Sequence, residues 1–370
     1  MAATKVYIPY LVFTGDAFLK EHAVTVEDGI IKSVLPVSAL DKNIPTEHFP
    51  ESILVPAFID LQLYGAYEKL FAVYPNKESL HLLNKYCNEG GAAFCMPTVA
   101  TNETNVFYQC IDAIKNYWKE GGKGILGLHI EGPWINKIKR GAHIESLIHS
   151  PTLEEAEALL EYGKGIIKII TLAPEVCSQE VIGLIRSYDV KIFAGHSNAD
   201  YEEAMQGFNN GISSVTHLYN AMSPLQHRSP GLVGAAFDHQ TIMASIIADG
   251  YHVDYAALRI AKKIMKERLF AITDAVTTTN DGYYQHQPKG DKYTADGILS
   301  GSALTMYKAL QNLVDHCGIE LDEALRMCSL YPARVMQMDT KLGRIAKGHE
   351  AKLALVPVDL HNGNAQLLPF

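Results

Sequence analysis

The sequence predicts an α/β fold: a (β/α)₈ TIM-type barrel with a small β-sandwich domain built from both chain termini. Three observations predict this fold: eight short apolar runs separated by amphipathic segments, polar residues ending several runs, and shorter strand patterns near both termini. A chain of 370 residues exceeds the usual size of a single core, so a barrel with an appendage suits it. We expect the small β domain to comprise residues 1–53 and 344–370, and the barrel to comprise residues 54–343.

The eight apolar runs have the near-continuous character of parallel strands that are buried on both faces. They occupy residues 52–62, 91–98, 124–131, 165–174, 190–197, 211–218, 242–250 and 268–275. The segments between them show helical patterns. Thr152 with Glu155 three residues later predicts a capped helix start, and residues 253–269 and 302–317 place apolar side chains along one helical face. A doubly wound open sheet is the alternative, but no Gly-rich phosphate fingerprint follows an early run.

Composition and charge exclude several classes of function. The chain is 48% apolar and 20% charged, which is ordinary for a globular protein. Its net charge of −9 argues against nucleic acids and anionic membranes as partners. No signal-peptide pattern opens the sequence, no apolar run reaches membrane-spanning length, and the six cysteines are scattered. Together these features predict a cytoplasmic location.

Polar side chains end five of the apolar runs, where the active sites of such barrels lie. They are Gln62, Glu131, His196, His217 and Asp274. Two histidines and a glutamate match the ligand set of catalytic zinc sites, in which water takes the fourth position. A bound divalent metal would lower the pKa of a water molecule toward ~7, and Asp274 could accept its proton. A single strand-end histidine is more often structural, and Asp274 alone could be a turn residue, but jointly they favour a metal site.

Several motifs resemble those of a known family. They are HIEGPW with GAH shortly after it, AGHSNADYEEA, VTHLYNAMSPLQHRSPG, IIADGYHVD, ITDA and LSGSALTM. The motifs and their order resemble those of the N-acetylglucosamine-6-phosphate deacetylases of the amidohydrolase superfamily. The resemblance extends from LVPAFIDLQ to LGRIAKG, which is most of the chain. The resemblance implies hydrolysis of the N-acetyl group of N-acetylglucosamine 6-phosphate to give glucosamine 6-phosphate and acetate.

The resemblance also implies roles for individual residues. It makes Glu131, His196 and His217 the metal ligands, Asp274 the general acid and base, and His143 the group that polarises the acetamide carbonyl. The positions that match sugar- and phosphate-binding residues are Ala142, Asn220, Ala221, Arg228, His252, Leu299, Ser300 and Gly301. In the family, arginine and histidine can reach the phosphate across a subunit interface, so the resemblance implies a homodimer.

The end of the first barrel strand departs from a common amidohydrolase pattern. Many members carry His-x-His there, which supports a second metal, whereas this chain has Gln62-Leu63-Tyr64. Glutamine and neutral tyrosine are poor substitutes for imidazole ligands, so we expect one divalent metal ion per subunit, with Gln62 in a supporting role. Zn²⁺ suits the ligand set, although Fe²⁺, Co²⁺ or Mn²⁺ can use similar ligands.

Two functional alternatives share the same residues. The site could act on N-acetylgalactosamine 6-phosphate or another N-acyl amine, because one sequence does not distinguish epimers. Alternatively, the barrel could bind metal or sugar phosphate without catalysis, since a fold by itself does not prove activity. Residues 288–297 predict an exposed hairpin beside the site, in preference to a lid.

Overall fold

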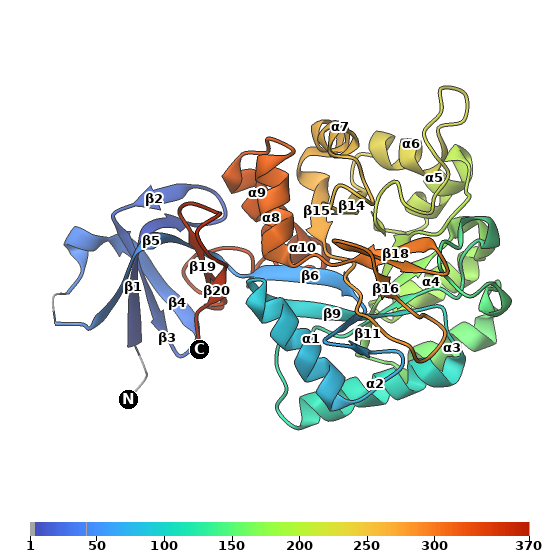
Figure 1. Cartoon of the computed structure of the whole chain (residues 1–370), viewed down its shortest axis with the longest axis horizontal. Coiled ribbons are helices and arrows are strands. Elements are labelled where there is room, and N and C mark those ends of the chain that lie inside the picture. The colour runs from blue at the N-terminus through green and yellow to red at the C-terminus, as the bar shows by residue number, and fades with distance from the viewer. Residues whose placement is uncertain (1–3, 42, 370) are drawn as a thin grey trace. The chain divides into compact units, whose positions relative to one another are not determined.

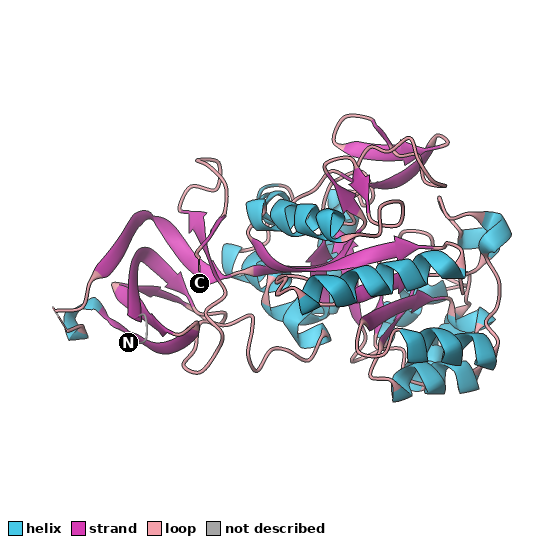
Figure 2. Cartoon of the chain, turned by 90° about the horizontal axis from the view of Figure 1, so that it is seen from below, coloured by secondary structure: helices cyan, strands magenta, loops and turns pink. Residues whose placement is uncertain are grey.

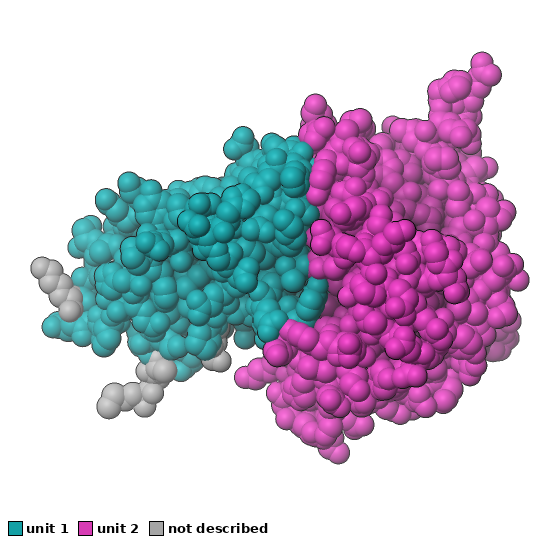
Figure 3. Space-filling model, viewed as in Figure 1, with its two compact units in different colours: residues 1–60, 86–94, 305–370 teal, residues 61–85, 95–304 magenta. Residues whose placement is uncertain are grey.

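The computed structural model of the chain describes residues 4–41 and 43–369. The chain divides into two compact units (Figure 3). Unit 1 comprises Met1–Asp60, Tyr86–Phe94 and Thr305–Phe370, and unit 2 comprises Leu61–Lys85 and Cys95–Leu304. Among the described residues, no helix combines the length and the apolar character needed to cross a membrane.

Unit 1 contains a seven-stranded sheet to which both ends of the chain contribute. Its strands are β1 (Thr4–Phe13), β2 (Phe18–Lys20), β3 (His22–Glu27), β4 (Ile30–Pro36), β5 (Thr46–Pro56), β19 (Leu353–Pro357) and β20 (Gln366–Leu367). Strand β19 pairs antiparallel with β5, so a C-terminal strand extends a sheet begun by the N-terminal strands. Buried side chains such as Tyr7, Val24 and Leu355 form its core. The predicted separate β structure from both termini is confirmed.

The helical part of unit 1 comes from the C-terminal third of the chain. It consists of α8 (Met306–Asp315), α9 (Leu321–Cys328) and α10 (Leu330–Val335). Thr305 caps α8 by accepting a hydrogen bond from the Lys308 N–H at 3.2 Å. Apolar residues at helical spacing, including Leu310 and Leu313, are buried, as the sequence pattern predicts.

Eight parallel strands form the second sheet, in the order β15-β14-β13-β12-β11-β10-β9-β6 (Figure 1). In chain order they are β6 (Phe58–Leu63), β9 (Ala92–Ala100), β10 (Leu128–Glu131), β11 (Ile167–Leu172), β12 (Lys191–Ala194), β13 (Ser214–Val215), β14 (Met243–Ile247) and β15 (Leu269–Ile272). Each of the eight predicted apolar runs overlaps one of them; six strands lie wholly within their runs, whereas β6 and β9 extend one and two residues further. The sequence therefore predicted every strand of this sheet.

The eight-stranded sheet closes on itself where its first strand meets its last. The Asp274 N–H donates to the Gln62 carbonyl at 2.9 Å, and the Tyr64 N–H donates to the Ala275 carbonyl at 2.8 Å. A parallel bridge between Leu63 and Ala275 lies at the same place. These bonds complete a (β/α)₈ barrel, and its seam lies at the C-terminal ends of β6 and β15.

Seven helices follow successive strands, and both views show helices flanking the strands (Figures 1 and 2). They are α1 (Lys77–Glu89), α2 (Thr104–Lys119), α3 (Leu153–Tyr162), α4 (Gln179–Ser187), α5 (Tyr201–Asn209), α6 (Gly231–Asp238) and α7 (Tyr255–Met265). The predicted cap of α3 is present, because the Thr152 hydroxyl oxygen accepts the Glu155 N–H at 3.1 Å. At α5, Asp200 and Glu203 form a reciprocal capping box.

The loops after the barrel strands carry the remaining short elements. The hairpin β7 (Gly65–Ala66) and β8 (Lys69–Leu70) follows β6, and the 3₁₀ turns Lys137–Lys139 and Glu145–Leu147 follow β10. After β15 comes a three-stranded antiparallel sheet of β16 (Gln287–Pro288), β17 (Lys292–Ala295) and β18 (Ile298–Ser302). Residues 288–297 thus lie in a hairpin, the form favoured from the sequence. Further 3₁₀ turns are Val37–Ala39, Pro174–Val176 and Lys266–Arg268.

Candidate active site

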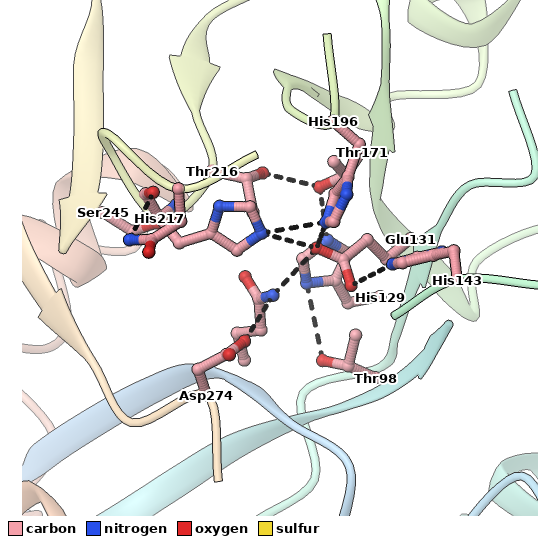
Figure 4. Close-up of polar contacts among 12 residues, drawn as sticks. Thr98, His129, Glu131, His143, Thr171, His196, Thr216, His217, Ser245 and Asp274 are labelled. Atoms are coloured by element: carbon pink, nitrogen blue, oxygen red, sulfur yellow. Dashed lines mark hydrogen bonds and ion pairs between the residues drawn. The ribbon is translucent and has the colours of Figure 1, made fainter. Parts of the chain in front are cut away.

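Polar side chains from separate strands meet at the C-terminal end of the barrel (Figure 4). Glu131 is the last residue of β10, while His196, His217 and Asp274 each follow the end of a strand by two residues. These last three residues have positive φ angles of 48°, 34° and 54°. Left-handed backbone is costly for residues other than glycine. The strand ends are therefore strained at the residues that sequence reasoning selected.

The spacing of three buried ligand atoms suits a single metal ion. Glu131 Oε1 lies 3.1 Å from His217 Nε2 and 3.3 Å from His196 Nε2, and the two Nε2 atoms lie 3.1 Å apart. Ligand atoms about 2.0–2.1 Å from one tetrahedral zinc ion are roughly 3.3 Å apart. The three side chains thus fit a common divalent ion, and all are buried.

The protonation of His196 supports the same conclusion. Its Nδ1 lies 3.0 Å from the Lys139 carbonyl, which can only accept, so Nδ1 carries the proton of the neutral ring. The Nε2 lone pair then faces a carboxylate oxygen and the Nε2 of His217. Acceptors this close require a positive centre between them, either a proton on His217 or a metal cation. This donor set fits a metal-binding site.

His143 lies beside this cluster with the opposite tautomer. Its Nδ1 accepts the Thr101 N–H at 3.3 Å and lies 2.7 Å from the Thr101 hydroxyl, so Nε2 carries the proton. That Nε2 lies 3.4 Å from Glu131 Oε2. Burial, and then the charge of His196, lower the pKa of His143 to about 4, which keeps the ring neutral at physiological pH. His143 is therefore a neutral hydrogen-bond donor.

A second combination of side chains also meets the requirements of a metal site. Ligand atoms of Glu131, His143 and His196 lie within 4.8 Å of one another. The histidine tautomers distinguish the set with His143 from the set with His217. The Nε2 of His143 carries a proton and so has no lone pair to offer a metal, whereas the Nε2 of His217 faces the other ligand atoms. We therefore favour His217 as the third ligand.

Gln62 and Tyr64 connect the Glu131 carboxylate to Asp274. The Gln62 amide nitrogen, which carries two hydrogens, lies 2.8 Å from Asp274 Oδ1, 3.1 Å from Glu131 Oε1 and 2.8 Å from the Tyr64 hydroxyl oxygen. The Tyr64 hydroxyl in turn donates to Glu131 Oε2. Burial, with the charges of Asp274 and Glu131, raises the pKa of Tyr64 well above 10, so it remains a hydroxyl. The sequence showed Tyr64 as a departure but gave no sign of this contact.

The carboxylates of the site are held in different charge environments. Burial alone would raise the pKa of Glu131, but the neighbouring histidines, His196 first among them, hold it well below its usual value. Burial raises the pKa of Asp274, and the nearby charge of Glu131 acts in the same direction. The pKa of Glu131 is thus lowered and that of Asp274 raised, so Asp274 is the more able of the two to exchange a proton.

A cavity of about 300 Å³ opens beside these side chains. It is lined by the predicted catalytic residue His143 and by most residues predicted to bind the substrate: Ala142, Asn220, Ala221, His252, Leu299 and Ser300. Gly301 is not part of the lining. A Cβ atom at Gly301 would lie 2.5 Å from Val276 Cγ1, so this glycine lets β18 approach a residue that does line the cavity.

His252 and Arg228, both predicted to bind phosphate, lie in different settings. His252 lines the cavity, and its Nδ1 lies 2.6 Å from Asp249 Oδ2. Asp249 also accepts the N–H groups of Tyr251 and His252, which fixes the ring. Arg228 is exposed in the turn closed by Gln226 and Ser229, and the structure does not bring it into the cavity lining. Asp249 was missed in the sequence, although it lies three residues before His252.

Comparisons with known proteins identify relatives of this chain. The model of the Amidohydrolase family matches residues 53–367, and that of the NagA composite domain matches residues 11–49. The N-acetylglucosamine-6-phosphate deacetylase of Haemophilus influenzae is 32% identical, covering 93% of each chain. The N-acetylgalactosamine-6-phosphate deacetylase of Shewanella sp. is 33% identical, covering 90% of this chain and 87% of its own.

A solved structure extends the likeness to the whole fold. The crystal structure of N-acetylglucosamine-6-phosphate deacetylase from Pasteurella multocida matches with a TM-score of 0.93 and 31% identity, covering 98% of this chain and 97% of that one. These findings confirm the resemblance that the sequence motifs carried. The chain belongs to the amidohydrolase family, in its N-acetylglucosamine-6-phosphate deacetylase group.

Proposed function

We propose that this protein hydrolyses the acetamide of N-acetylglucosamine 6-phosphate to glucosamine 6-phosphate and acetate. The observation that carries the proposal is the convergence of a metal-ligand set, a buried carboxylate and a neutral histidine donor on one cavity. Relatives of that name, similar over most of their length, support the choice of substrate.

One divalent metal ion per subunit would be held by Glu131, His196 and His217. When bound, such an ion supplies a Lewis acid that polarises the acetamide carbonyl and lowers the pKa of a water molecule. We propose Zn²⁺, which suits two imidazoles and a carboxylate, although Fe²⁺, Co²⁺ and Mn²⁺ can occupy similar sites. Gln62 and Tyr64 are hydrogen-bond donors to Glu131 and poor metal ligands, which favours a single ion.

Asp274 is the proposed general base and acid of the reaction. Its carboxylate takes a proton from the attacking water and returns that proton to the amine nitrogen as the C–N bond breaks. Gln62 holds one of its oxygens, Oδ1, at 2.8 Å, which orients the other oxygen for this transfer. The pKa of Asp274, raised by burial, brings the carboxyl closer to the range in which it can both accept and donate.

His143 is the proposed donor to the acetamide oxygen. As that oxygen gains negative charge during water attack, the hydrogen bond from His143 Nε2–H strengthens, and stabilisation of this kind is a large catalytic contribution. Thr101 fixes the tautomer through its N–H and hydroxyl, so the donor is set before the substrate arrives.

The phosphate end of the substrate is assigned to Asn220, Ala221 and His252, and the sugar to Ala142 and the turn from Leu299 to Gly301. His252 is oriented by the Asp249 carboxylate, whose Oδ2 lies 2.6 Å from the ring Nδ1. Arg228 is exposed, so we assign it to the phosphate bound in a neighbouring subunit, an arrangement that requires a homodimer. No disulfide joins the six described cysteines, which supports a cytoplasmic location.

A second substrate deserves the same test. N-acetylgalactosamine-6-phosphate deacetylases are as similar to this chain as the glucosamine enzymes are, so the C4 epimer is the alternative substrate.

The test is acetate release from both epimers and from unphosphorylated N-acetylglucosamine, using protein as purified, after chelation, and after zinc is restored. We expect release that depends on metal and phosphate and is fastest with N-acetylglucosamine 6-phosphate. Release from neither phosphosugar, with any metal, would refute the proposal.

A further inference from the structure

The segment after β15 places an unassigned histidine in the wall of the cavity. His286 lines the cavity and is only 4% exposed. Its Nδ1 lies 2.9 Å from the hydroxyl oxygen of Ser300, which also lines the cavity. None of the catalytic roles proposed above uses His286, although it lies in the same cavity as the residues that have them.

Stacked rings fix the position of His286 relative to the proposed catalytic histidine. The ring of Tyr284 stacks on His286 with centroids 6.1 Å apart and planes at 12°. The same ring packs edge-on against His143, with centroids 6.3 Å apart at 81°. The Tyr284 hydroxyl donates to the Thr101 carbonyl at 2.6 Å, and Thr101 also orients His143. The Tyr284 ring therefore lies against both His286 and His143 and holds the two imidazoles in a defined relative position.

Within the described chain, one ring nitrogen of His286 is left for a ligand. Ser300 takes Nδ1, and no described protein group forms a hydrogen bond with Nε2. Burial lowers the pKa of His286 to about 4, so the ring is neutral at physiological pH. A neutral imidazole suits a hydroxyl group better than a phosphate dianion.

The chemistry of an N-acetylated amino-sugar phosphate indicates which group His286 can meet. The acetamide is assigned to the metal-binding cluster and His143, and the phosphate to Asn220 and His252, which leaves the ring hydroxyls. Those at C3 and C4 lie between the C2 acetamide and the C6 phosphate. The C4 hydroxyl is also the group whose orientation differs between the glucosamine and galactosamine epimers.

We propose that His286 is a specificity-determining residue that hydrogen-bonds the C3 or C4 hydroxyl of the sugar through Nε2. This inference rests on the proposed function and deepens it, because it names a residue that recognises a hydroxyl group of the sugar ring. Ser300 orients the imidazole, and Tyr284 supports it from one face.

The test combines variants of the protein with variants of the substrate. His286→Phe keeps an aromatic ring to stack on Tyr284 but removes both nitrogens, and His286→Gln keeps a hydrogen-bonding group. Each is assayed with N-acetylglucosamine 6-phosphate, its C4 epimer, and the 3-deoxy and 4-deoxy analogues. The exposed His361→Phe serves as a matched control outside the cavity.

We expect His286→Phe to raise KM for N-acetylglucosamine 6-phosphate about three- to tenfold, the effect of one neutral hydrogen bond, with kcat within about twofold. One deoxy analogue, the one that lacks the contacted hydroxyl, should be insensitive to the substitution. His286→Gln should recover part of the KM effect, and His361→Phe should change nothing.

Two results would overturn the inference: an equal loss with all four compounds, which marks a structural role, or no change in KM with any of them. Failure of the proposed function gives a different result, because the wild-type protein would then release no acetate. In that case calorimetric binding of the four phosphosugars to wild type and His286→Phe still decides the role of His286, by the same pattern of differences.

Discussion

Two buried polar clusters adjoin each other inside the barrel (Figure 4). They differ in whether each hydrogen-bond acceptor has a donor within the protein. In the neutral cluster, His129 Nδ1 lies 3.2 Å from the Leu61 carbonyl, His129 Nε2 lies 2.8 Å from the Thr171 hydroxyl, and that hydroxyl lies 2.7 Å from Thr216. Every contact can pair one donor with one acceptor. In the metal-ligand cluster of Glu131, His196 and His217, three acceptor atoms face one another and share at most one proton.

The pairing of donors with acceptors distinguishes the two clusters better than their residue types do. Both clusters are buried, both contain histidine, and both include a residue of β10, on which His129 precedes Glu131 by only two residues. The neutral cluster needs nothing from outside the protein. The metal-ligand cluster needs a positive centre, either a proton on His217 or a metal cation, so its geometry suits a bound ion.

The largest expected effect tests the chemistry beside the metal-ligand cluster. Asp274→Asn keeps the shape of the side chain but removes proton transfer, so kcat should fall about 10²–10⁴-fold. Metal content and thermal unfolding should stay close to wild type, since Asp274 is not one of the three ligands. Acetate release, metal analysis and calorimetry measure these quantities. Turnover near the wild-type rate would exclude Asp274 as the base.

A pair of substitutions sharpens the distinction between ligand and donor. His217→Gln should lose the metal on desalting, whereas His143→Gln should retain it and lose about 10²–10³-fold in kcat, as for removal of an oxyanion donor. Metal analysis after gel filtration, together with acetate release, makes the comparison. Loss of metal from the His143 variant to the same extent would show that the tautomers had been assigned wrongly.

The neutral cluster should affect stability at acidic pH. Burial lowers the pKa of His129 to about 4, below its ordinary value of 6.5, so between these values the unfolded chain binds a proton that the folded chain does not. The free energy of unfolding should therefore fall as pH drops through this range, by up to ~3 kcal/mol from this residue. His129→Gln, which does not titrate there, should lose less stability between pH 7 and pH 5.

Urea unfolding of metal-stripped protein at the two pH values measures the difference. Stripping both proteins matters because acid also releases metal from its ligands. An equal loss of stability in wild type and variant would show that His129 is not a cause of acid sensitivity.

The smallest expected effect concerns the support of Glu131. Tyr64→Phe removes the hydroxyl that donates to Glu131 Oε2, and loss of such a partner to a metal ligand should weaken metal affinity about tenfold. Tyr74→Phe is a matched control, because Tyr74 also donates to a carboxylate, that of Asp281, outside the site. Competition titration with a zinc chelator measures both. Equal affinities in the two variants would remove Tyr64 from the support of the metal.

Much of the fold and the centre of the site could be predicted from the sequence. Buried parallel strands produce continuous apolar runs, and charged residues such as Glu131 and His196 stand out at their ends. Tyr64, Asp249 and His286 were not given roles, because their contacts depend on loops with no periodic pattern. Arg228 matched a family motif, but the fold of one chain leaves it exposed and outside the cavity lining.

The seam of the barrel has a consequence for the order in which the protein is made. Glu131, His196 and His217 are all synthesised before Asp274, the residue whose N–H closes the ring onto Gln62. Because chains leave the ribosome from the N-terminus, all three proposed ligands emerge while the proposed general base is still missing. A nascent chain that bound a metal at that stage would lack the Asp274 carboxylate, and the last barrel strand delivers the closed ring and that carboxylate together.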